Sequence, residues 1–168
     1  ELGLFSIVEG HMKTLDFTKL DTEAAKVTVN SLQQLLSDFQ IFYTNLRGFH
    51  WNIKGKNFFQ LHARFEEVYN DTSEKIDEIA ERILMLDGVP SHNFSEYLAL
   101  AQVKETKYVT DGDEGLKNML DTLSILIQTE RAILAQAAEA GDEATVAMMS
   151  DYITQQEKTT WMLTSYFS

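Results

Sequence analysis

The chain has 168 residues, a formal net charge of −12 and 44% hydrophobic residues. This length suits one domain with a sizeable core, and no apolar run approaches the roughly 18 residues that a membrane-spanning helix needs. The absence of cysteine excludes disulfides, thiolate metal ligands and thiolate catalysis. We therefore expect a soluble, cytoplasmic protein with no membrane partner, whose negative charge opposes a dominant phosphate-binding face.

The opening stretch ELGLFSIVEGHM lacks the basic start of a signal peptide. Its last three residues, Gly10 to Met12, have the sequence of a cloning junction ahead of a natural start. We expect residues 1–11 to be a vector-derived leader and residues 12–168 to form a single domain.

Two long stretches with apolar residues at alternating steps of three and four predict two amphipathic helices. The first begins near Asp21 or Thr22 and continues past residue 46. The second runs from Phe58 to Leu86, with Asn57 as its cap. Because only a short loop separates them, we expect an antiparallel helical hairpin.

A long crossing, Ser91 to Asp111, follows this hairpin and contains SEYLALA, which predicts a short helix. A third helix is marked by leucines between Leu116 and Leu134 and stops at Gly141, and Asp142 caps a fourth. The pattern predicts an all-α, ferritin-like four-helix bundle with a short extra helix in the long crossover between helices 2 and 3.

The second predicted helix carries polar residues suited to metal binding on the side away from its apolar stripe. These residues are His62, Glu66, Asp77 and Glu81. His62 and Asp77 lie about 22 Å apart along the helix axis, too far for one metal site. If they share an ion, a second chain must bring them together.

A twofold axis near the middle of this helix would place His62 of one chain beside Asp77 and Glu81 of another. The same flank carries small or apolar residues that suit a dimer contact: Tyr69, Ser73, Ala80 and Leu84. Imidazoles combined with carboxylates suit ferrous iron or zinc, and incomplete ligation by protein leaves room for an oxidant.

Simpler interpretations of the same residues stay open at this level. Acids such as Asp77 and Glu81 on the outer face of a helix are usually only solvated. His50 continues the apolar stripe of the first helix, which favours a hydrogen-bonded core histidine. Trp51 and Trp161 are tryptophans, which more often pack against other side chains than take part in redox chemistry.

The segment GFHWNIKGKNFFQLHARFEEVYNDTSEKIDEIAERILMLDGVP resembles the signature region of the Dps proteins, the mini-ferritins that protect DNA in starved cells. The match includes FHW, the twelve-residue spacing of His50 and His62, the NFF-LH-FE run and D-x-x-A-E-R. The resemblance implies a hollow dodecamer built from twofold dimers. It implies a ferroxidase that oxidises Fe(II), preferentially with hydrogen peroxide, and stores ferric mineral.

Carried over by position, the resemblance assigns a two-iron ferroxidase site shared between subunits. His50 and His62 look like ligands from one subunit, and Asp77 and Glu81 look like ligands from its partner. Glu66 resembles the nearby acid that helps to hold a second iron.

The resemblance also implies roles outside the ligand set. Trp51 and Trp161 look like the aromatic residues near the site. Acids at the start of the last helix resemble those that line the iron-entry pores: Asp142, Glu143 and Asp151, with Ala147 where the family usually has another acid. The mobile Lys-rich tail of DNA-binding members is missing, so we expect weak or no DNA binding, although nucleoid association fits the family.

Two other classes compete with this hypothesis. A larger ferritin would bind iron inside one chain through Glu-x-x-His motifs, but no histidine here has a glutamate three residues before it. The other alternative is a non-catalytic, DNA-compacting helical scaffold.

Overall fold

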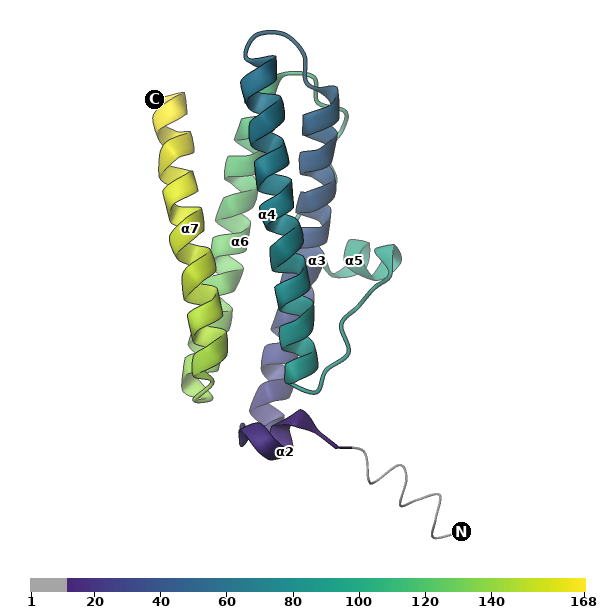
Figure 1. The fold of residues 1–168 in the computed structure, drawn as a ribbon, viewed down its shortest axis with the longest axis vertical. Helices are drawn as coiled ribbons and strands as arrows, with labels where there is room; N and C mark the ends of the chain where they lie inside the picture. The colour runs from purple at the N-terminus through teal and green to yellow at the C-terminus, as the bar shows by residue number, and fades with distance from the viewer. Residues whose placement is uncertain (1–11) are drawn as a thin grey trace.

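The computed structural model describes residues 12–168, and the predicted leader lies outside the described residues. The described helices are α2 (Thr14–Thr18), α3 (Thr22–Asn52), α4 (Phe58–Met85), α5 (Phe94–Leu100), α6 (Gly112–Glu139) and α7 (Glu143–Phe167). The four long helices α3, α4, α6 and α7 stand side by side, with α5 beside α3 (Figure 1). The predicted four-helix bundle with a short crossover helix is confirmed, whereas α2 was not predicted.

Aspartate side chains cap the N-termini of three of the long helices. Asp21 accepts a hydrogen bond from the Ala24 amide at 2.9 Å, and Asp111 and Asp142 act in the same way on α6 and α7. Asn57 occupies the predicted cap position of α4 but makes no side-chain capping bond. Its contribution is a left-handed φ of 65°, which asparagine tolerates better than most residues.

The buried face of each long helix contributes to one hydrophobic core. Near the start of α6 the core is narrow: a Cβ added to Gly115 would lie 3.0 Å from Cζ of Phe65. Gly115 thus lets α6 approach the rings of Phe49 and Phe65, whose centroids are 5.5 Å apart. This contact fixes the end of α3 against the start of α4. None of the described helices is long and apolar enough to cross a lipid bilayer.

Hydrogen bonds tie the long crossover to α3. The buried carboxylate of Asp38 accepts from the Gln102 and Val103 amides at 2.6 and 3.0 Å. At the far end, the Lys54 amide donates to the carbonyl of Thr110 at 2.9 Å, so the α3–α4 loop is joined to the last residues of the crossover. These bonds satisfy backbone groups in the middle of the crossover and near its last residues, as a segment packed against a core requires.

An ion pair joins the end of α4 to the start of α7. Nη2 of Arg82 lies 2.7 Å from Oδ1 of Asp142, and both side chains are largely buried. The same carboxylate accepts from the amide and the hydroxyl of Thr145 at 3.1 and 2.6 Å. Asp142 thus caps the N-terminus of α7 and also pairs with the buried guanidinium of Arg82.

Replacing Asp142 with alanine should lower the free energy of unfolding by about 3 kcal/mol, because Arg82 loses its buried partner and α7 loses its cap. The matched control is Glu143→Ala, the next residue, which is exposed and should change stability by less than about 1 kcal/mol. Urea unfolding of both variants at one protein concentration measures the difference. Equal losses in the two variants would contradict the assigned role of the ion pair.

Candidate metal centre

Two histidines from adjacent helix ends contact each other directly. His50 lies in the last turn of α3 and His62 lies near the start of α4, on either side of the short loop 53–57. Nδ1 of His50 lies 2.6 Å from the carbonyl oxygen of His62, and Nδ1 of His62 lies 2.7 Å from that of His50. The two imidazoles stack with centroids 3.7 Å apart and an angle of 11° between their planes. The arrangement is therefore reciprocal in both hydrogen bonding and stacking.

The end of α3 explains why the carbonyl of His50 can accept this bond. In a continuing helix that carbonyl would accept from the amide of Lys54, four residues later. The helix ends at Asn52, and the Lys54 amide donates to Thr110 in the crossover instead. The carbonyl of His50 thus has no helical donor and is available to His62. The carbonyl of His62 lies inside α4, but a carbonyl oxygen has two lone pairs, so it can accept both a helical amide and Nδ1 of His50.

These bonds determine which ring nitrogen carries the proton. A carbonyl oxygen only accepts, so Nδ1 of both His50 and His62 must be the N–H donor. In the neutral imidazole the lone pair is then on Nε2. A histidine that donates one ring N–H to a backbone carbonyl and keeps the other nitrogen free is the usual arrangement of a metal ligand. Both rings are therefore prepared to bind a cation through Nε2.

Two aromatic residues hold the imidazoles in place, and the sequence interpretation did not assign them this role. Phe58 stacks on the other side of His62, with centroids 4.9 Å apart and planes at 22°. Tyr69 meets His50 edge-on at 5.3 Å. The detectable signal for Phe58 was its position four residues before His62 on the same helix, where side chains meet.

The predicted carboxylate ligands all lie on α4, at different distances from the histidine pair. Glu66, Asp77 and Glu81 are all exposed, as the helical pattern predicted. Glu66 is one turn after His62, whereas Asp77 and Glu81 lie about 22 Å and about 28 Å from His62 along the helix axis. Among residues 12–168, no group of three or more His, Asp or Glu side chains is placed to hold a metal ion. One chain therefore keeps Asp77 and Glu81 apart from the two histidines.

The two tryptophans are exposed, at 61% for Trp51 and 63% for Trp161, so packing in the core of this chain explains neither. The guanidinium of Arg47 lies 4.5 Å above the Trp51 ring. Trp51 and Trp161 belong to the C-terminal parts of α3 and α7, which lie at the same end of the bundle (Figure 1). Their proximity to a metal site stays a prediction.

The three predicted pore acids differ in their surroundings. Glu143 and Asp151 are exposed and free to face a channel. Asp142 is buried and committed to Arg82 and Thr145, so the structure gives it a structural role that competes with the predicted one. The pore role of all three acids stays a prediction.

Comparisons with known proteins agree with this architecture. The ferritin-like domain family matches residues 29–168. A DNA protection during starvation protein of Porphyromonas gingivalis is 49% identical over 154 residues, which cover 92% of this chain and 97% of that protein.

Solved structures show the same fold. A Dps protein from Vibrio cholerae O1, described as a member of a broad superfamily of ferritin-like diiron-carboxylate proteins, has 51% identity and a TM-score of 0.87, covering 89% of this chain and 94% of that one. Dps from Staphylococcus aureus has 34% identity and a TM-score of 0.81, covering 84% and 95%. The chain therefore belongs to the Dps family of ferritin-like proteins.

Proposed function

We propose that this protein is a ferroxidase that oxidises Fe(II), preferentially with hydrogen peroxide, and stores the ferric product. The observation that carries the proposal is the reciprocal pairing of His50 and His62, which leaves Nε2 of both rings free for a metal. Glu66, one turn after His62, adds a carboxylate on the same helix. The description of the Vibrio cholerae relative as a diiron-carboxylate protein supports iron as the substrate.

We infer that the complete centre forms between two chains related by a twofold axis. Antiparallel contact of two α4 helices would bring Asp77 and Glu81 of one chain to His50 and His62 of the other. Small or apolar residues on the same flank of α4, among them Ala80, permit such a contact. We propose that these dimers assemble into a hollow dodecamer that holds the mineral, with iron entry past the acids Asp142, Glu143 and Asp151.

The donor set suits the proposed reaction. Carboxylates favour the harder ferric ion, whereas imidazoles also accept ferrous iron, so the same centre can bind substrate and product. Two ferrous ions each give one electron to one peroxide molecule, whose O–O bond breaks. Its oxygen atoms leave as water or enter the ferric mineral, and hydrolysis of the ferric ions releases protons. The role of the chain's own residues is to hold both irons beside one oxidant.

An iron site inside one bundle, as in a larger ferritin, is not supported by the interior. Three carboxylates are buried among the described residues, and one of them, Asp142, is already paired with Arg82. The other two are Asp38 and Glu130. Asp38 is committed to backbone amides of the crossover, and Glu130 has the buried ammonium group of Lys75 as its neighbouring charge. A lysine beside a single carboxylate disfavours a second cation.

We expect hydrogen peroxide to oxidise iron faster than oxygen does in the presence of the protein. Anaerobic addition of Fe(II) followed by hydrogen peroxide should give ferric absorbance faster than the same addition of oxygen, with less hydroxyl radical than iron and peroxide produce alone. Spin trapping measures the radical, and His92→Ala, which changes an exposed crossover histidine, is the control that should behave as the wild type. Equal radical yields with and without the protein would refute the protective ferroxidase function.

A chain-mixing experiment tests the shared centre. One variant carries His50→Ala and His62→Ala, the other carries Asp77→Ala and Glu81→Ala, and each alone should be nearly inactive. In a mixed dimer one site keeps all four ligands and the other loses all four. Random pairing of the co-refolded variants should therefore restore about a quarter of wild-type ferroxidase activity.

Native mass spectrometry must first show that mixed dimers form in this experiment. Activity that stays at the level of the separate variants, with mixed dimers present, would rule out a centre shared between chains. Activity retained by either variant alone would show that the removed side chains are not ligands.

DNA binding should be weak, because the chain carries a net charge of −12 and phosphate backbones repel it. We propose that protection of the cytoplasm and its DNA comes from removing iron and peroxide. A gel mobility assay with duplex DNA in low salt should show no shift at neutral pH. A shift that disappears as salt rises would contradict this expectation and indicate a basic surface formed in the assembly.

A further inference from the structure

A buried acid and a buried amide face each other between α6 and α7. Glu130 is 0% exposed and Gln156 is 5% exposed. Nε2 of Gln156 donates to Oε2 of Glu130 at 2.9 Å. Oε1 of Glu130 and Oε1 of Gln156 are both buried without a hydrogen-bond partner among the described residues. Each side chain thus keeps one buried oxygen that could accept a hydrogen bond but has no donor.

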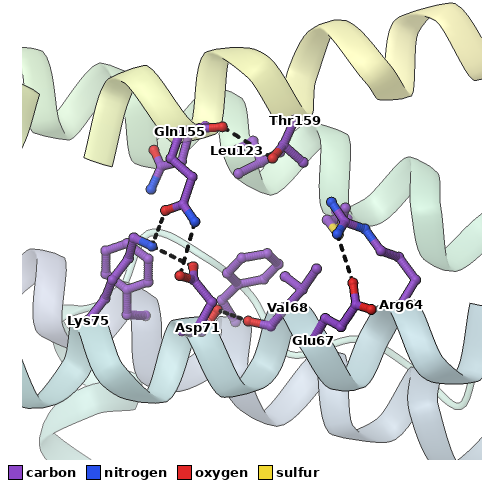
Figure 2. A pocket seen from close by; sticks show the side chains of 13 residues that line it. Arg64, Glu67, Val68, Asp71, Lys75, Leu123, Gln155 and Thr159 are labelled. Atoms are coloured by element: carbon purple, nitrogen blue, oxygen red, sulfur yellow. Dashed lines mark hydrogen bonds and ion pairs between the residues drawn. The ribbon is translucent and has the colours of Figure 1, made fainter. Parts of the chain in front are cut away.

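Among the described residues, no cation forms a direct ion pair with Glu130. The ammonium group of Lys75 on α4 donates to Asp71 and to Gln155, as Figure 2 shows. Within residues 12–168, neither Lys75 nor any other basic side chain forms an ion pair with Glu130.

The remaining titratable groups near Glu130 are also committed. Arg131, the next residue on α6, pairs with Glu157, and the hydroxyl of Tyr152 on α7 donates to Glu78 at 2.7 Å. The buried titratable groups of α3 are Asp38 and His50, whose bonds to the crossover and to α4 have been described. An ionised Glu130 would therefore be a buried charge with one neutral donor, which is energetically costly.

One proton resolves both unpaired oxygens. A protonated Oε1 of Glu130 is an O–H donor, and the unpartnered Oε1 of Gln156 is a buried acceptor on the side chain that already bonds to Glu130. We infer that Glu130 is a carboxylic acid in the folded protein and forms a two-bond acid–amide pair with Gln156, which joins α6 to α7 and stores one proton per chain. The bond already present, from Gln156 to Glu130, is the other half of this pair.

The electrostatics agree with this geometry. Burial raises the pKa of Glu130 from its ordinary 4.5 to about 8, and the hydrogen bond from Gln156 and the charge of Lys75 only partly oppose the rise. Between these two pKa values the folded chain binds a proton that the unfolded chain has lost. The stability contributed by the pair is therefore fully present below pH 4.5, and it decreases as pH rises toward 8.

A cavity lies beside the amide member of this pair. The cavity has a volume of about 260 Å³, and Gln156 lines it. Lys75, Asp71 and Gln155 line it as well (Figure 2), whereas none of the predicted iron ligands does. A polar cavity of this size can hold water, so water can lie next to Gln156 without unfolding of the bundle.

Infrared difference spectroscopy of the assembled wild type against Glu130→Gln tests the inference directly. The wild type should show the carbonyl stretch of a protonated carboxylic acid at pH 6.5, and this band should disappear with a midpoint near pH 8. The control variant Glu139→Gln changes an exposed acid on the same helix and should leave the band in place. Absence of the band at pH 6.5 would overturn the inference.

A stability measurement provides an independent test, because glutamine at position 130 can make the same two bonds without titrating. The wild type should become less stable than Glu130→Gln as pH rises from 6.5 to 8, with the ratio of their unfolding equilibrium constants changing up to about tenfold per pH unit. If Glu130 were instead an ionised partner of Lys75, Glu130→Gln would be the less stable protein at every pH. That result would refute the acid–amide pair.

Discussion

The reciprocal hydrogen bonds between His50 and His62 are the constraint on which the proposed chemistry depends. They use the carbonyl of His50, which has no helical donor because α3 ends at Asn52. They also require a short loop, so that the first turns of α4 lie beside the last turn of α3. The Lys54 amide, which bonds to the crossover, connects this local geometry to the rest of the bundle. The pairing of His50 with His62 thus depends on the packing of α3, α4 and the crossover.

The same reasoning explains why activity should depend on assembly. Folding one chain orients the imidazoles but leaves Asp77 and Glu81 far along α4, since a straight helix cannot bring distant turns together. In the shared centre that we propose, the rigid helix holds the histidines and the acids at fixed positions for a twofold partner. In the single chain the acids stay solvated, which avoids the cost of burying carboxylates before a cation is present.

The interior of the bundle contains charges that are stabilised in different ways. Asp142 pairs with Arg82 and caps α7, and Lys75 binds Asp71 and Gln155. Glu130 has no such ionic partner, and neutralisation by a proton is the remaining way to bury it. Each solution uses contacts between helices that are distant in sequence, so these residues contribute to the specific alignment of α4, α6 and α7.

The sequence by itself determined the four long helices, the crossover helix, their order and the family, but not α2. Apolar spacing, aspartate caps and the signature around the two histidines are local properties. It also indicated that His62 and Asp77 cannot share an ion within one chain, since helical rise alone decides that. Only the tertiary structure decided the tautomers of His50 and His62 and the isolation of Glu130. Both features depend on where each helix ends and on which side chains meet across the bundle. A periodic sequence pattern contains no information on such contacts.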